Sequence, residues 1–85
     1  MNIYVGNLSY DAADEDLWAA FEAYGTVSSA SVIKDRFTGR SRGFGFVEMA
    51  AREEGQAAVD GLNGKEMLGR ALRISEARSQ ERREG

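Results

Sequence analysis

The chain has 85 residues, enough for one domain, and it contains neither cysteine nor histidine, which excludes disulfides, thiolate metal sites, a cysteine nucleophile and the usual neutral-pH general base. Its net charge is −3, but residues 1–33 hold five acidic and no basic residues, whereas residues 34–43 hold four basic residues and one acidic residue. No apolar run approaches the roughly 20 residues of a membrane helix and the start is too polar for a signal peptide, so we expect a reduced, soluble, cytoplasmic domain without metal or cofactor.

The first half of the chain predicts a strand, a helix and a second strand. Residues 2–8 alternate briefly around β-branched and aromatic side chains, as strands do, and we expect this strand to end at Gly6. Residues 14–25 carry apolar side chains at helical spacing, and the glycine at position 25 is expected to end that helix. Residues 26–34 are short and β-branched, and they form the second predicted strand. The polar segment 35–42 that follows is typical of a hairpin loop.

The second half predicts a strand, a helix, a short hairpin and a last strand. Residues 43–49 form the third strand, and residues 51–64 form a helix that the pair Asn63-Gly64 ends. Residues 65–69 form a connecting hairpin and residues 70–75 the fourth strand. The order β-α-β-β-α-β favours an α+β, ferredoxin-like split-βαβ fold, in which one four-stranded antiparallel sheet carries both helices on one face. We expect this domain to span residues 1–77, followed by a charged tail at 78–85.

Alternation along the strands separates two sets of side chains. The aliphatic set belongs under the helices and comprises Ile3, Val5, Val47, Met49, Leu72 and Ile74. The other set faces away from the helices and comprises Tyr4, Arg42, Phe44, Phe46, Glu48, Arg73 and Ser75. The alternative, with both phenylalanines in the core, would expose Val47 and Met49 to water. Gly43 and Gly45 are expected to let a helix approach the sheet closely.

Exposed rings beside positive charges form a platform for flat ligands such as nucleobases. Stacking of a base on an aromatic side chain contributes about 1–3 kcal/mol. Backbone phosphates of such a ligand would meet the basic side chains of the 34–42 segment, which are Lys34, Arg36, Arg40 and Arg42.

Two segments on the predicted platform resemble the paired signature motifs of the RNA recognition motif family. They are "IYVGNL" at 3–8 and "RGFGFVEM" at 42–49, and the second meets six of the seven specified positions of the octamer. The likeness covers residues 1–77. It is strongest to short single-domain bacterial members and to the corresponding module of cold-inducible, glycine-rich proteins, which suggests a cold-shock context.

The resemblance implies single-stranded RNA as the ligand, with two to three bases on the sheet and single-stranded DNA bound more weakly. By family analogy Tyr4 and Phe44 stack on bases, Phe46 packs on the sugars, and Arg42 contacts phosphate. Arg73, Ser75 and Arg78 are expected to contribute at and beyond the last strand. The chain departs from the family pattern at Met49, which replaces an aromatic residue. It departs again at Ala13, which leaves the helix cap to Asp11 or Asp14.

Several side chains stand outside this pattern. Gly55 and Gly61 lie inside the second helix, where each costs about 1 kcal/mol relative to alanine. Trp18 lies off the apolar stripe of the first helix; it either packs against a helix edge or the sheet margin, or forms a protein contact. Phe37, at the hairpin tip, either stacks on RNA or pins the loop.

Three functions fit the predicted fold. The first is non-catalytic binding of single-stranded RNA, in RNA chaperoning or the regulation of translation or decay. The second is a protein-interaction module, which would commonly lose the exposed rings that this chain retains. The third is an acylphosphatase-like enzyme, which needs an arginine and an asparagine in a phosphate cradle; "GNLSYD" has no arginine. We therefore expect a protein that is not an enzyme.

Overall fold

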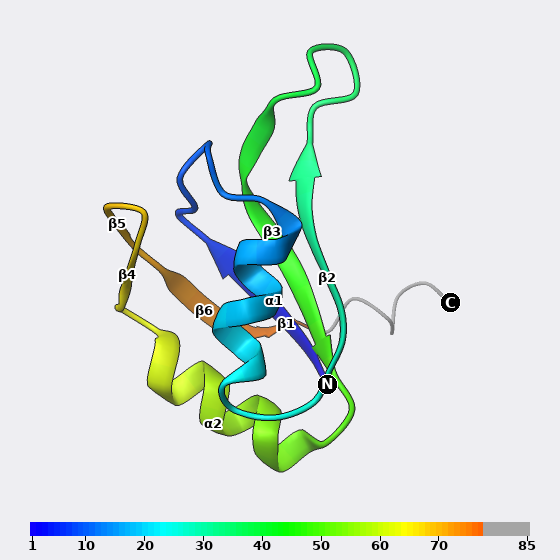
Figure 1. Ribbon diagram of the computed structural model, residues 1–85, viewed down its shortest axis with the longest axis vertical. Helices are drawn as coiled ribbons and strands as arrows, with labels where there is room; N and C mark the ends of the chain where they lie inside the picture. The colour runs from blue at the N-terminus through cyan, green and yellow to red at the C-terminus, as the bar shows by residue number, and fades with distance from the viewer. Residues whose placement is uncertain (78–85) are drawn as a thin grey trace.

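The computed structural model describes residues 1–77, which fold into a sheet with two helices on one side (Figure 1). The predicted charged tail, 78–85, lies outside the described residues. The main elements are β1 (Asn2–Gly6), α1 (Asp14–Glu22), β2 (Val27–Lys34), β3 (Ser41–Met49), α2 (Arg52–Leu62) and β6 (Arg73–Ala77). Two shorter strands, β4 (Glu66–Met67) and β5 (Arg70–Ala71), lie between α2 and β6.

The sheet has the predicted topology. Its strand order is β2-β3-β1-β6, and every neighbouring pair is antiparallel. The predicted aliphatic set is buried between the sheet and the helices, which contribute Leu17, Phe21, Ala58 and Leu62 to the same core. Both helices thus cover the same face of the sheet, because each helix and the sheet have one apolar side, and these sides are buried against one another. The ferredoxin-like fold is confirmed.

The last strand begins later than the sequence predicts. Residues 70 and 71 form β5, which pairs with β4 in a separate hairpin, and the last strand of the main sheet is β6. The turn residues of the hairpin, Leu68 and Gly69, both have positive φ (53° and 86°), as the type I′ form of a two-residue hairpin turn requires. The predicted hairpin is therefore confirmed, but the predicted strand at 70–75 is wrong in its limits.

Helix α1 lacks the predicted aspartate cap. Ala13 occupies the N-cap position, and neither Asp11 nor Asp14 caps the helix. Instead, Oδ2 of Asp16 accepts a hydrogen bond from the backbone N–H of Ala13 at 2.8 Å. Oδ1 of Asp14 accepts one from the N–H of Val32 at 2.7 Å, so it ties the start of α1 to β2. The helix also ends at Glu22, three residues before the predicted stop at the glycine.

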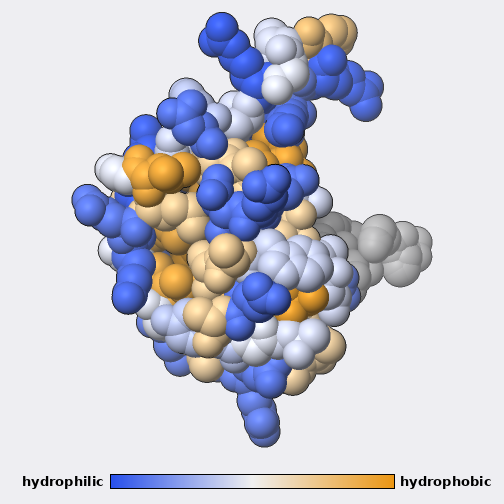
Figure 2. All heavy atoms as spheres, in the orientation of Figure 1, coloured by the Kyte–Doolittle hydropathy of each residue, from blue (hydrophilic) through white to orange (hydrophobic). Residues whose placement is uncertain are grey.

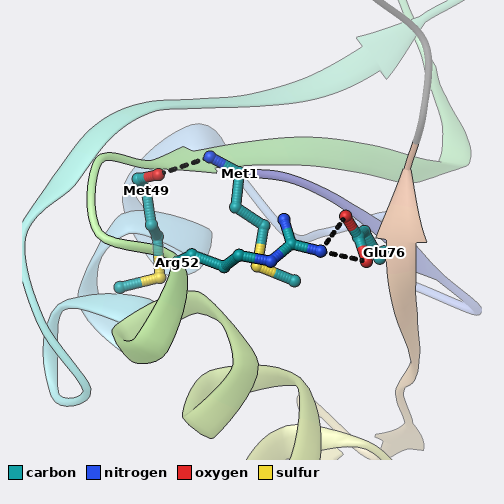
Figure 3. Close-up of polar contacts among 4 residues, drawn as sticks. All are labelled: Met1, Met49, Arg52 and Glu76. Carbon is teal, nitrogen blue, oxygen red and sulfur yellow. Dashed lines mark hydrogen bonds and ion pairs between the residues drawn. The ribbon is translucent and has the colours of Figure 1, made fainter.

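The glycines of α2 have a packing role that the sequence does not reveal. A Cβ atom at position 55 would lie 2.5 Å from Sδ of Met1, and one at position 61 would meet the hydroxyl of Tyr24. The same end of the molecule is held by the Met1 amino group, which donates to the Met49 carbonyl at 2.7 Å, and by the ion pair Arg52–Glu76 at 3.1 Å (Figure 3). Glycine has a low helix propensity, but at these two positions its missing side chain lets Met1 and Tyr24 pack closely against α2.

None of the helices in the described part of the chain is both long enough and apolar enough to cross a membrane.

Candidate nucleic-acid interface

Three aromatic rings lie together on the sheet face opposite the helices; we call Tyr4, Phe44 and Phe46 the ring platform. Each pair of ring centroids is about 6 Å apart (5.9–6.0 Å). The planes of Tyr4 and Phe44 differ by 31°, whereas Phe46 meets each of the other two edge-on. Because the rings shield one another, they are half-buried rather than fully exposed. Neither α1 nor α2 covers them.

The register between β1 and β3 brings the three rings of the platform together. Tyr4 of β1 lies directly opposite Phe46 of β3, and Phe44 is two residues along the same strand. Val47 and Met49 point the other way and are fully buried, at 1% and 0% exposure. The alternative that would bury both phenylalanines under the helices is therefore wrong.

The glycines of β3 differ in their roles. A Cβ at Gly45 would meet the Ser31 carbonyl and lie 3.1 Å from Cδ1 of Leu17, so this glycine does admit α1. Gly43 has φ +86°, and a Cβ there would lie 3.3 Å from Cε1 of Tyr10, in the loop between β1 and α1. The prediction that Gly43 admits a helix is therefore wrong.

Strand β6 borders the platform on one side. Arg73 and Ser75 are exposed, and Ser75 lies directly opposite Tyr4 in the register. Together with Tyr4 and Asn7 they line a hollow of about 730 Å³. Asn7 follows β1 directly and has a left-handed backbone (φ 57°), and its side chain donates to the Ala71 carbonyl at 2.6 Å.

The predicted basic residues lie on the β2–β3 hairpin, which projects beyond the rest of the fold (Figure 1). Hydrophilic side chains gather at this projecting end (Figure 2). Lys34, Arg36, Arg40 and Arg42 are all exposed. Arg42 precedes the platform on β3. Lys34 and Arg40 line a second hollow with Arg42, of about 750 Å³, whose opposite wall is the loop between β1 and α1. Arg78 lies outside the described residues.

Asp35 organises the hairpin loop. Its Oδ1 atom accepts hydrogen bonds from the backbone N–H groups of Phe37 and Thr38, at 2.7 and 3.2 Å. These bonds, with a smaller contribution from the charge of Arg42, hold the pKa of Asp35 below its ordinary value of 3.8. The side chain of Phe37 is 91% exposed, so it does not pin the loop. The ordered loop presents Phe37 to solvent.

Two other aromatic residues are exposed. Trp18, on α1, is 38% exposed and lines a shallow hollow of about 280 Å³ with Asp14, Glu15 and Glu22. Tyr10 lies in the loop between β1 and α1, and neither the signature motifs nor the helical spacing singles it out. Its position next to Gly43 depends on how the loop packs on β3.

The geometry suits recognition by stacking and charge. The platform offers π faces, its two borders offer arginine side chains and the Ser75 hydroxyl, and stacking on such rings tolerates any base. Within residues 1–77 no group of three or more acidic, cysteine or histidine side chains is placed to hold a metal ion.

Comparison with known proteins agrees with this geometry. The family model for the RNA recognition motif matches residues 3–73. The chain belongs to the RNA recognition motif family. RbpA of Synechocystis sp., named as a candidate RNA-binding protein, is 51% identical over the whole of this chain and 84% of its own length.

Two solved structures are similar to this chain in fold and in sequence. The crystal structure of RNA-binding protein PG1 has a TM-score of 0.88 and 53% identity, covering 91% of this chain and 93% of that one. A structure described as an Sxl-lethal protein/RNA complex has a TM-score of 0.86 and 34% identity, covering 91% of this chain and 46% of that one.

Proposed function

We propose that this protein binds single-stranded RNA on the ring platform, by stacking two to three bases and by pairing phosphates with basic side chains. The observation that carries the proposal is the cluster of Tyr4, Phe44 and Phe46, spaced about 6 Å apart on a sheet face that neither helix covers. Large aromatic side chains on a sheet surface favour a flat partner. The names of the relatives support the same ligand.

Each predicted site residue except Arg78, which lies outside the described residues, takes a role in this proposal. Tyr4 and Phe44 stack on bases, and Phe46 packs against the sugars between them. Arg42, beside Phe44 on β3, pairs with a phosphate, while Lys34, Arg36 and Arg40 extend the positive surface along the hairpin. Arg73 and Ser75 lie beside Tyr4, so they meet the edge of the base stacked on that ring.

We further propose a role in post-transcriptional regulation or RNA chaperoning, without catalysis, in the cytoplasm. Stacking on rings tolerates any base, and basic side chains attract phosphates whatever the sequence, so such a module is suited to rapid, sequence-tolerant binding. Single-stranded DNA is expected to bind more weakly, because it lacks the 2′-hydroxyl that family members use to recognise RNA. A cold-shock context is a prediction from the resemblance alone.

Titration of 5′-fluorescein-labelled random-sequence RNA 8-mers, followed by anisotropy, tests the proposal. We expect saturable binding by the wild type and a clear loss for the Tyr4→Ala/Phe44→Ala double variant, with DNA 8-mers weaker than RNA. The matched control is Trp18→Ala, which removes an exposed aromatic side chain from the opposite side of the molecule. Equal binding by the wild type and the double variant would contradict the platform assignment.

A protein contact through Trp18 is a second proposal, supported by a different observation. Three carboxylates surround the exposed indole, so a partner segment carrying lysine or arginine would complement it in charge and could stack on its ring. The two proposals are compatible, because the surfaces lie on different elements. Family membership does not favour the acylphosphatase-like alternative.

A further inference from the structure

The exposed side of α1 carries a hollow in which a tryptophan ring lies among carboxylates. Trp18 is 38% exposed, and the hollow of about 280 Å³ is also lined by Asp14, Glu15, Ala19 and Glu22. The three acidic residues lie three or four positions from Trp18 along the helix, so they share its face. The hollow therefore offers an aromatic surface surrounded by negative charge.

The negative charges of this hollow are not neutralised within the fold. Neither Glu15 nor Glu22 forms an ion pair with any residue between 1 and 77, where the single such pair is Arg52–Glu76. Glu22 is the last residue of α1, where a negative charge opposes the helix dipole. Its carboxylate thus does not stabilise its own helix and is available to a cationic partner.

The tip of the β2–β3 hairpin carries the complementary features. Phe37 is 91% exposed, so it does not fill the hollow of its own chain. Arg36 and Arg40 flank it and form no ion pair within residues 1–77. The loop is held in shape by Asp35, whose N–H donates to the Arg40 carbonyl and whose carbonyl accepts from the N–H of Gly39, both at 2.8 Å. A held loop can insert its apolar tip with little ordering cost.

The two surfaces are opposite in charge and separate in position. Residues 34–42 hold four basic residues and one acidic residue, whereas α1 holds four acidic residues and no basic one. The hairpin projects beyond the rest of the fold, so it can reach a neighbouring molecule while its own α1 stays accessible (Figure 1). Uniformly spread, a net charge of −3 would make copies repel one another; this polarised distribution favours a head-to-tail approach.

We propose that the hairpin tip of one molecule docks into the α1 hollow of a second copy of this chain. Phe37 of the first copy then lies against Trp18 of the second, and Arg36 and Arg40 pair with Glu15 and Glu22. The inference rests on the proposed protein contact through Trp18, and it identifies the basic partner segment as the chain's own hairpin.

The contact should be weak and reversible. A loop tip on one helix face buries much less than the roughly 1,200–2,000 Å² of a stable interface, and exposed ion pairs are screened by salt. RNA phosphates would use the same arginine side chains, so bound RNA should displace the second copy.

Sedimentation equilibrium of nucleic-acid-free protein at low salt, over about 10 μM to 1 mM, tests the proposal. We expect the apparent mass to rise with concentration and to return to that of the monomer at high salt. Phe37→Ala and Trp18→Ala should each weaken association by at least about 10-fold, because a buried ring is lost. The matched control is Tyr10→Ala, which removes an exposed ring from the β1–α1 loop and should associate as the wild type does.

A mixture of two variants tests which surfaces meet. Phe37→Ala retains the hollow and Trp18→Ala retains the hairpin tip, so an equimolar mixture should form 1:1 complexes although each variant alone stays monomeric. A mixture that also stays monomeric overturns the contact. If Trp18→Ala fails to fold, Glu22→Arg takes its place, because a positive charge at the end of α1 favours the helix dipole.

RNA 8-mers separate this inference from the proposed RNA binding. Excess 8-mer should return the wild type to monomers, and association that persists while the 8-mer is bound overturns the assignment of the hairpin. A wild type that stays monomeric without RNA, yet binds 8-mers, overturns the inference and leaves the proposed RNA binding intact. Self-association with the expected variant pattern but without RNA binding supports the inference and contradicts the proposed RNA binding.

Discussion

Truncation of Phe44 separates the binding role of the ring platform from its part in stability. Phe44 touches Tyr4 and Phe46, each at a centroid distance of 6.0 Å, and it is half-buried. Aromatic pairs contribute about 0.5–1.5 kcal/mol each, and half-exposed pairs belong to the lower part of that range. Phe44→Ala should therefore cost about 1–2 kcal/mol of unfolding free energy, more than a fully exposed ring would.

The same variant should lose about 1–3 kcal/mol of RNA binding, because one base loses its stacking partner. Met49→Ala is the matched control on the same strand. Its side chain is fully buried, so it should cost about 2–5 kcal/mol of stability. The folded fraction of that variant should still bind RNA normally.

Urea denaturation and RNA titration of each variant provide the measurement. The reasoning would be refuted if Phe44→Ala lost as much stability as Met49→Ala while its folded fraction bound RNA like the wild type. That result would make Phe44 a core residue and remove it from the interface.

Three further predictions follow from the hairpin and the core. With about four phosphate contacts, a plot of the logarithm of RNA affinity against the logarithm of salt concentration should have a slope near −3. Arg40→Ala should flatten this slope by about 0.7, whereas Arg52→Ala, on α2, should leave it unchanged. Equal slopes for the wild type and both variants would contradict the assignment of phosphate contacts to the hairpin. Gly45→Ala should destabilise the fold by about 2 kcal/mol or more in urea denaturation, because its Cβ would meet the Ser31 carbonyl; wild-type stability would contradict this packing. Because the pKa of Asp35 is lowered in the folded protein, its hydrogen bonds to the loop amides should persist at neutral pH and be lost as pH falls through a value below 3.8. The amide resonances of Phe37 and Thr38 should therefore shift with a midpoint below 3.8. A midpoint at or above 3.8 would show that these bonds do not stabilise the carboxylate.

The two faces of the sheet could be assigned from the sequence, because strand alternation has a strict period of two. Placing Val47 and Met49 in the core puts Phe44 and Phe46 on the other face, whatever the rest of the fold does. The order of strands and helices then leaves one arrangement that buries every apolar side. The fold and the ring platform were predictable for this reason.

Contacts between residues far apart in the chain were decided only by the tertiary structure. No local pattern shows that Asp14 would bond the amide of Val32 rather than cap its own helix, or that Gly55 would face Met1. The degree of burial of the platform also depends on how closely its three rings pack. Tyr10 meets Gly43 only because its loop folds back onto β3. Local propensity and periodicity act over a few residues, whereas these contacts require the closure of loops between distant elements, so the packed core determines them.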